Sequence, residues 1–211
     1  MKRFPLGTAL WAGLLGLLAS LPVAAGEARL DAFFDGLQSV HAEFKQTVLG
    51  PQGRVLDQSW GTMAVQQPGL FRLDYHRPHE QQYVGDGQRL WAYDQDLEQV
   101  TVREQESGLD DTPALLLAQP EAVRDTFSVH AIGARDGSEW VELRPRRGEG
   151  GFEFVRLGFR GDTLHIMELK DNFGQTTRLE FSQLQRNPRL DRALFQFEPP
   201  PGVDVVGDPG S

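Results

Sequence analysis

The residues with the clearest potential for chemistry are two histidines and a glutamate that lie close together, His76, His79 and Glu80. Imidazole and carboxylate groups bind zinc when their donor atoms converge on one point. The segment that ends here alternates polar and apolar residues as a strand does, and Pro78 then interrupts it. Because a strand end followed by proline does not bring the two rings together, the pattern predicts a solvated turn and no metal site.

A second candidate for chemistry is the carboxylate pair Asp110 and Asp111, since paired carboxylates can transfer protons. The pair directly precedes Thr112, Pro113 and an apolar run over residues 114–118. Threonine caps helices, proline suits the first helical position, and negative charge is favoured at that end of the helix dipole. We therefore interpret the two carboxylates as the start of a helix.

The sequence lacks the common motifs of covalent catalysis: it has no Cys, no G-x-S-x-G and no S-x-x-K. The glycines of residues 148–151 lie between two expected strands, which indicates a hairpin connection and not a phosphate-binding loop before a helix. These patterns predict a protein that is not an enzyme and that needs no metal or cofactor. A lipid hydrolase stays open as an alternative, although it would need a nucleophile with a base in reach.

The first 25 residues have the layout of a secretory signal peptide, with Lys2 and Arg3 before an apolar run from Leu6 to Leu21. The run is short for a membrane span, at about 1.5 Å per residue across about 30 Å of hydrocarbon. Small residues follow, and we expect cleavage near Gly26, export to the periplasm and a single domain over residues 26–211. A retained single-pass anchor is the alternative. Without Cys, the mature chain cannot carry a thioether-linked lipid.

The net charge of the chain is −9, and it becomes −11 on cleavage because the signal segment carries two positive and no negative charges. Nucleic-acid binding needs clustered Lys and Arg, so we expect no nucleic-acid partner and no charge-driven membrane attachment. The absence of Cys also means that the fold has no disulfide bonds and must be held by its core. We expect a monomer.

Two periodicities predict the elements. The apolar residues of segment 27–46 follow a helical spacing, which predicts an amphipathic helix there: Leu30, Phe33, Phe34, Leu37, Val40, His41 and Phe44. From Val55 onward the period changes to two, with turns rich in Gly, Asp and Asn between short runs. Such runs predict an antiparallel meander or barrel. Within residues 89–94, Leu90 and Ala92 are expected on one face and Trp91 and Tyr93 on the other.

The apolar helix expected at residues 114–118 contains three consecutive leucines, Leu115, Leu116 and Leu117, and has almost no polar face. Such a helix is buried on all sides or covers apolar surface. Together with the N-terminal helix it could close an incomplete barrel over an apolar cavity, since about eight strands already leave room for a small ligand. An ordinary packed core is the alternative, and the pattern does not distinguish the two.

Several stretches, in order and at matching spacing between residues 28 and 206, make the chain similar to the LolA family of periplasmic lipoprotein carriers. They are Val40–Gln46, Pro68–Arg72, Asp86–Tyr93, Gln99–Thr101, Thr112–Leu116, Phe195–Pro200 and Gly202–Val203. The resemblance implies an open antiparallel β-barrel of about eleven strands with an α-helical lid over an apolar cavity.

The resemblance also implies a function. A carrier of this family would bind the acyl chains of triacylated outer-membrane lipoproteins released by an inner-membrane LolCDE-type ABC exporter. It would then deliver them to an outer-membrane LolB-type receptor. A carrier of another lipid or glycolipid is the alternative, because a fold does not fix a function.

By position in the family, the resemblance places Phe71, Trp91, Tyr93, Leu115 and Leu116 in the cavity or its lid. The full set of residues expected to bind lipid adds apolar side chains from the predicted helix and strands: Leu37, Phe44, Met63, Leu73, Leu157, Ile166, Leu179 and Phe181. Family members usually carry an Arg before the proline of the segment at residues 67–72, where it holds the empty lid shut. This chain has Gln67 there, so the lid latch is expected from Gln67 or from Arg72.

Overall fold

The computed structural model describes residues 22–105, 113–146 and 151–207, and these residues form one large sheet with a few short helices. The helices are α1 (Pro22–Phe34), α2 (Pro113–Ala118), α3 (Pro120–Thr126) and the 3-10 helix η1 (Arg192–Phe195). Among the described residues, no helix is long and apolar enough to cross a bilayer.

The strands alternate along the chain with tight turns, as the period-two pattern predicts. The first six are β1 (Ser39–Leu49), β2 (Val55–Gln66), β3 (Leu70–Arg77), β4 (Gln81–Asp86), β5 (Arg89–Asp94) and β6 (Gln99–Glu104). The others are β7 (Phe127–Arg135), β8 (Ser138–Pro145), β9 (Phe152–Arg160), β10 (Thr163–Asp171), β11 (Thr176–Arg186) and β12 (Asp204–Gly207).

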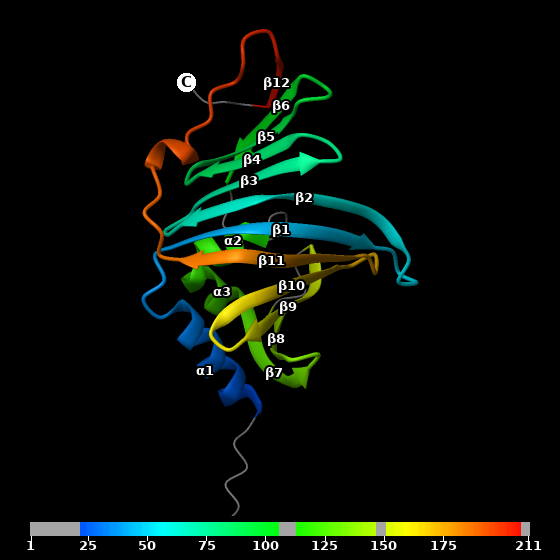
Figure 1. The fold of residues 1–211 in the computed structure, drawn as a ribbon, viewed down its shortest axis with the longest axis vertical. Helices are drawn as coiled ribbons and strands as arrows, with labels where there is room; N and C mark the ends of the chain where they lie inside the picture. Colours follow the sequence, from blue (N-terminus) through cyan, green and yellow to red (C-terminus); the bar gives the residue numbers. More distant parts are fainter. Residues whose placement is uncertain (1–21, 106–112, 147–150, 208–211) are drawn as a thin grey trace, which may run out of the picture.

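All twelve strands belong to one sheet in the order β12-β6-β5-β4-β3-β2-β1-β11-β10-β9-β8-β7 (Figure 1). Neighbours are antiparallel, except that the short strand β12 runs parallel to β6. Strands β7 and β12 lie at the two edges, so the sheet is open and not closed into a barrel. The prediction of an incomplete, mainly antiparallel barrel is confirmed, with β12 as a further strand.

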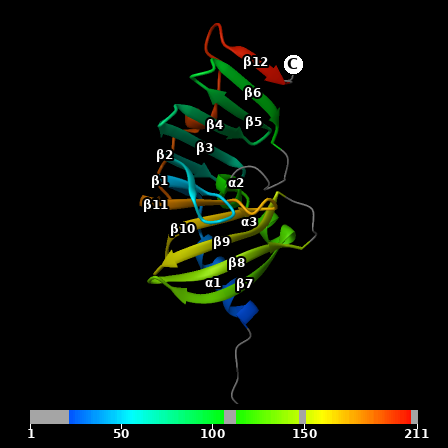
Figure 2. The same cartoon turned by 90° about the vertical axis from the view of Figure 1, so that its right-hand side faces the viewer.

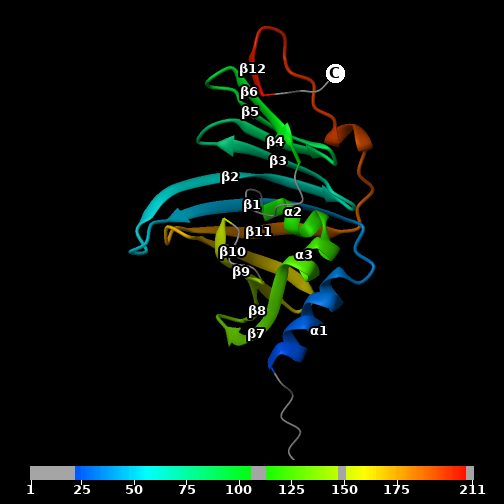
Figure 3. The same cartoon turned by 180° about the vertical axis from the view of Figure 1, so that it is seen from behind.

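Helices α1, α2 and α3 lie on one face of this curved sheet, which we call the covered face (Figures 2 and 3), whereas η1 contacts β3 and β4 from the other face. Helix α2 contacts β2 and β3, α3 contacts β7, and α1 contacts β7 and β8. The chain thus passes from the first six strands through α2 and α3 before it begins the other edge at β7. Helices α2 and α3, which we call the lid, therefore connect the two halves of the sheet.

The predicted helix over residues 27–46 is wrong in its second half. Helix α1 ends at Phe34, and Val40, His41 and Phe44 lie in strand β1. Gly36 ends the helix because its φ of 62° lies in the left-handed region, which glycine adopts without strain. Strand β1 then pairs with β2 on one side and β11 on the other, and this pairing outweighs the helical spacing.

The C-terminal end of α1 is also fixed from outside. The Arg186 guanidinium donates hydrogen bonds to the carbonyl oxygens of Phe33 and Asp35, at 2.7 and 3.1 Å. The Asn187 side chain donates another to the carbonyl oxygen of Gly36, at 2.8 Å. These contacts satisfy the free carbonyl groups that every helix leaves at its end, and they tie α1 to the end of β11.

Two apolar clusters fill the fold. The main cluster lies between the covered face and the helices, and includes buried side chains of α1, α2, α3 and most strands. The outer cluster lies on the opposite face and consists of Val84, Trp91, Val100 and Val102, against which Tyr93, Phe197 and Val203 pack. The segment after β11 thus crosses the outer face before β12 joins the sheet edge.

Candidate functional site

Helix α2 begins at Pro113 as predicted, and the side chains of Ala114 to Ala118 are at most 4% exposed. All five belong to the main cluster. Helix α2 is therefore buried between strands β2 and β3 of the covered face and the neighbouring helix α3. The predicted cap Thr112 and the carboxylates Asp110 and Asp111 lie outside the described residues.

The structure brings together most of the residues expected to bind lipid. The main cluster contains ten of them: Leu37, Phe44, Met63, Phe71, Leu73, Leu115, Leu116, Leu157, Leu179 and Phe181. They come from the α1–β1 turn, from α2 and from strands on both sides of β1, so the lid faces both halves of the sheet. Their role in lipid binding stays a prediction.

Three expected residues lie elsewhere. Trp91 and Tyr93 belong to the outer cluster, where their rings lie 5.6 and 6.1 Å from that of Phe197. The alternation was predicted correctly, but Leu90 faces the main cluster and its neighbours therefore face away. Trp91 also donates a hydrogen bond from Nε1 to Asp86 Oδ2 at 3.0 Å, which fixes the indole on the outer face.

Ile166 is the third exception, and a β-bulge explains it. The pairing of β10 with β9 shifts register between Leu164 and Ile166. The extra residue exchanges the two faces of the strand, so Met167 and Leu169 join the main cluster in place of Ile166, which stays half-buried outside it. Val65 and Met167 are cluster residues that the sequence analysis missed.

Phe71 belongs to the main cluster and is 0% exposed. It lies opposite Gly85 on β4. A Cβ atom at Gly85 would lie 2.2 Å from Phe71 Cε1, so the missing side chain is what makes room for the phenylalanine ring.

An aromatic row continues from Phe44 across the neighbouring strands. The ring of Tyr75 lies 5.1 Å from that of Phe44 and 5.7 Å from that of Tyr83, both edge to face. Burial raises the pKa of Tyr75, whose hydroxyl donates to Gln46 Oε1 at 3.0 Å, and burial followed by the Asp94 charge raises that of Tyr83. Both phenols are therefore uncharged around neutral pH, as an apolar interior requires.

Hydrogen bonds from the turn before β3 reach the backbone of the lid helix α2. Gln67 donates from Nε2 to the carbonyl oxygen of Leu117 at 3.0 Å, and the Gly69 amide donates to that of Ala118 at 2.9 Å. Gln105 supports the same turn, because its Nε2 donates to the Gly69 carbonyl oxygen at 2.7 Å. The residue in the family's arginine position thus contacts the backbone of α2.

The other latch candidate, Arg72, does not reach the lid. Its Nε donates to the Asp74 carboxylate at 2.7 and 3.0 Å, and its Nη1 donates to the Leu194 carbonyl oxygen at 3.3 Å. Arg72 therefore ties η1 to the outer face of β3, and of the two candidates only Gln67 contacts α2.

A cleft of about 670 Å³ lies beside this contact, between the α2–α3 junction and the turns that precede β1 and β3. Leu37 and Ala118 line it from the main cluster, and Gln38, Gln67 and Gln119 supply neutral amide groups. The cleft has few charges, so it suits an uncharged or peptide-like group next to the apolar interior.

The histidines do not converge on a common point. His79 Nδ1 lies 2.6 Å from Asp96 Oδ2, whereas His76 Nε2 lies 3.4 Å from Thr62 Oγ1 on another strand. Within the part of the chain that the structure describes, no group of three His, Cys, Asp or Glu side chains could hold a metal ion.

Comparisons with known proteins agree with this architecture. Residues 35–198 match the family model described as "Outer membrane lipoprotein carrier protein LolA". A Methylococcus capsulatus protein named outer-membrane lipoprotein carrier protein is 44% identical over 190 residues, covering 90% of this chain and 91% of the relative. A protein of the same name from Methylobacillus flagellatus is 43% identical over 185 residues, covering 88% and 90%.

Among solved structures, a DUF1329 family protein from Desulfovibrio piger has a TM-score of 0.51 with this chain. The similarity covers 84% of this chain and 98% of that one at 16% identity. At this identity the likeness concerns the fold alone.

Proposed function

Since the chain belongs to the LolA family of outer membrane lipoprotein carrier proteins, we propose that it carries the acyl chains of lipoproteins through the periplasm. It would do so by binding and release, without a chemical step. The cargo would be triacylated outer-membrane lipoproteins, received from a LolCDE-type ABC exporter in the inner membrane. A LolB-type receptor at the outer membrane would take them over.

The observation that carries this proposal is the apolar interior under a lid. Side chains from both halves of the sheet and from α1, α2 and α3 meet in one buried cluster. The lid helix α2 presents only apolar side chains to it, and the contact from Gln67 is a single neutral hydrogen bond. A neutral hydrogen bond contributes only about 0.5–1.5 kcal/mol, so the lid is held mainly by burial of the α2 leucines, which are at most 4% exposed. Acyl chains in the interior could replace these apolar contacts.

The physics of the cargo explains why a carrier is needed. Burial of one CH₂ group is worth about 0.8 kcal/mol, so three long acyl chains exceed roughly 20 kcal/mol. Free energies of that size lie at the practical limit of non-covalent affinity. Spontaneous escape into water is therefore negligible, and a carrier must offer an apolar site that can repack. The flexible side chains of Met63 and Met167 in the main cluster suit such a site.

The location follows from the same proposal. The family acts between two membranes, and residues 1–25 have the pattern of a signal peptide. We propose that the mature chain begins near Gly26. Gly26 already packs on β7, where an added Cβ would lie 2.5 Å from the Ala131 amide nitrogen. N-terminal sequencing of the protein from the periplasmic fraction tests this start.

Uptake of a triacylated lipopeptide tests the function. The purified protein is expected to take up the lipopeptide from inner-membrane vesicles and to elute with it. Phe71→Glu should abolish uptake while the protein stays folded by circular dichroism, because a carboxylate in this apolar site costs several kcal/mol. Leu97→Glu is the matched control, since Leu97 is 70% exposed. Normal uptake by a folded Phe71→Glu variant would refute the assignment of Phe71 to the lipid-binding site.

A further inference from the structure

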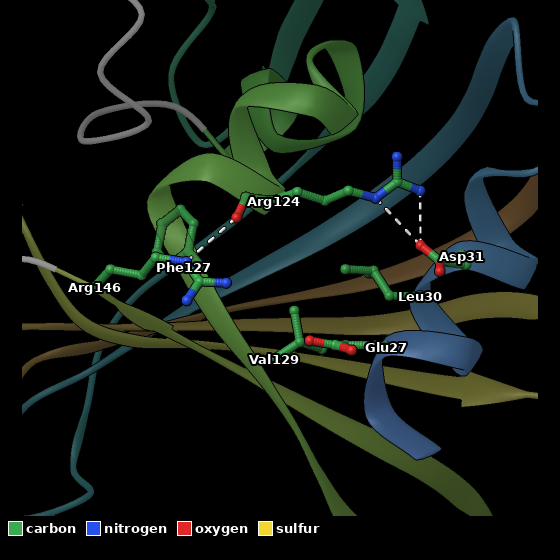
Figure 4. A pocket seen from close by; sticks show the side chains of 7 residues that line it. All are labelled: Glu27, Leu30, Asp31, Arg124, Phe127, Val129 and Arg146. Atoms are coloured by element: carbon green, nitrogen blue, oxygen red, sulfur yellow. Dashed lines mark hydrogen bonds and ion pairs between the residues drawn. The ribbon is translucent and has the colours of Figure 1, made fainter. Parts of the chain in front are cut away.

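A second pocket lies on the other side of the lid, between α1, α3 and β7 (Figure 4). Its volume is about 260 Å³. The inner lining is apolar and consists of Leu30, Phe127 and Val129, which are at most 4% exposed. All three belong to the main cluster, so this pocket opens directly onto the side chains of the interior.

The rim of the pocket is charged but balanced. Arg124 of α3 donates to Asp31 Oδ1 of α1 from Nη2 at 2.7 Å and from Nε at 3.2 Å. Arg146 donates from Nε to the Arg124 carbonyl oxygen at 3.4 Å, and Glu27 completes the rim. Two cations and two carboxylates leave the rim without net charge, so it does not select an ionic ligand.

The ion pair across the rim is weak. The side chains of Arg124 and Asp31 are 52% and 58% exposed, and an exposed ion pair contributes little to stability because water and salt screen it. The pair lies beside Leu30, Phe127 and Val129 at the mouth of the pocket (Figure 4).

Helix α1 does not need this pair to stay in place. The α1 side chains Leu30 and Phe33 are 1% exposed, and the Arg29 guanidinium lies 4.4 Å from the centre of the Phe159 ring. Arg186 holds the other end of α1 through the carbonyl oxygens of Phe33 and Asp35. The Asp31–Arg124 pair therefore bridges α3 to a helix that is already fixed.

We propose that the pocket lined by Leu30, Phe127 and Val129 is a side site that holds the distal end of one acyl chain, with the Asp31–Arg124 ion pair as its gate. The proposal rests on the proposed carrier function. A hydrocarbon chain suits the site because the inner lining offers only apolar side chains and the rim is neutral. The ion pair would close the site when no chain occupies it.

Photolabelling tests the site. A triacylated lipopeptide with a diazirine near the end of one acyl chain is loaded and irradiated, and the labelled peptides are identified by mass spectrometry. The proposal expects label on Leu30, Phe127 or Val129. Label confined to interior residues such as Phe44, Phe71 and Phe181 would overturn the side site and leave the carrier function intact. A protein that neither elutes with the lipopeptide nor becomes labelled would instead refute the carrier function.

Charge variants test the gate. Asp31→Asn should raise the fraction of label in the pocket, by up to about fivefold for an exposed pair. The exchange variant with Asp31→Arg and Arg124→Asp should return it toward the wild-type level. Glu153→Gln is the matched control, since it removes an ion pair of the same 2.7 Å length with Lys170, which joins β9 to β10. If Asp31→Asn labels like Glu153→Gln, the ion pair is not a gate.

Discussion

Gln67 joins the strands to the lid through its 3.0 Å hydrogen bond to the Leu117 carbonyl oxygen. Family members usually carry an arginine here, and an arginine offers five donors and a charge where glutamine offers two neutral donors. The neutral contact suits a lid that opens readily. It also means that the strength of lid closure in this chain can be raised by one substitution.

Gln67→Arg is expected to stabilise the closed lid. Hydrogen bonds from a charged donor contribute about 1.5–3 kcal/mol, against about 0.5–1.5 for a neutral one. The melting temperature of the empty protein should therefore rise, and uptake of an apolar fluorescent probe should slow. Both effects should shrink when cargo is bound.

Arg72→Ala is the comparison variant for this experiment. Arg72 contacts Asp74 and Leu194 but not α2, so its loss should leave the rate of probe uptake unchanged while it loosens η1. A faster uptake in Arg72→Ala, together with no effect of Gln67→Arg, would move the latch away from Gln67.

The absence of a side chain at Gly85 leaves room for the Phe71 ring in the main cluster. A methyl group at this position would meet the Phe71 ring at 2.2 Å, and overpacking of this kind costs about 1–3 kcal/mol. Gly85→Ala should lower the free energy of unfolding in urea by that amount. Gly50→Ala is a suitable control because a Cβ there makes only ordinary contacts, at 3.4 Å or more, with Leu56. Equal stability of the two variants would contradict the tight fit.

At the scale of elements, charged side chains on the outer face of β8 and β9 stabilise the half of the sheet that the C-terminal segment does not cover. Glu142 accepts hydrogen bonds from Arg144 at 2.6 Å and from Arg156 at 2.7 Å, and it is only 5% exposed. Burial alone would raise the pKa of Glu142, but the hydrogen bonds from the two arginines outweigh it and hold the pKa below its usual range. Arg156 lies opposite Glu142 on β9, and a pair of opposite charges on neighbouring strands stabilises the sheet.

The pH dependence of unfolding should show the stabilising contribution of the Glu142 carboxylate. Because its pKa is lower in the folded state, its contribution is present above the unfolded-state pKa and is lost as the pH falls through the folded-state pKa. Glu142→Gln should lower stability at pH 7 by about 1.5–3 kcal/mol, the usual worth of hydrogen bonds to a charged group. The difference from wild type should shrink toward pH 3 in urea unfolding series. A difference that is constant with pH would exclude this role of the charge.

The sequence predicts the strands better than it predicts where faces change. Alternation places Phe71 and Leu73 correctly because both sides of β3 are paired without interruption in that stretch. It fails at Ile166 because a single inserted residue exchanges the faces and leaves no mark on composition. The helical spacing of residues 30–37 continues by coincidence into β1, where Val40 and Phe44 are also four residues apart.

The site shows the same division. The resemblance and the alternation together find Phe71 and the leucines of α2, which meet in the main cluster. They misplace Trp91 and Tyr93, because only the path of the C-terminal segment shows that Phe197 covers those rings. The pocket under Asp31 and Arg124 also escapes sequence reasoning, since it depends on how α1 and α3, 93 residues apart at this contact, come to lie side by side.

At the scale of the whole molecule, the open sheet and its lid form one apolar interior with clefts on both sides of the lid. The side chains of the main cluster are all buried in this structure, from 0% exposure for Phe71 to 9% for Phe34. A ligand must therefore displace the lid or the side chains before it can bind. A rigidly packed core would resist this, whereas an interior closed by weak contacts would open transiently.

Binding of an apolar probe distinguishes these two states of the interior. The empty protein is expected to bind a naphthalene sulfonate dye under native conditions, because α2 has no polar face and covers only apolar surface. Lipopeptide should displace the dye, and Phe71→Glu should weaken its binding at least as much as it weakens uptake of cargo. Dye fluorescence and its loss on lipopeptide addition provide the measurement. If the dye binds only after acid or denaturant expands the protein, the interior is a filled core. Helix α2 would then be a structural helix that does not open for a ligand.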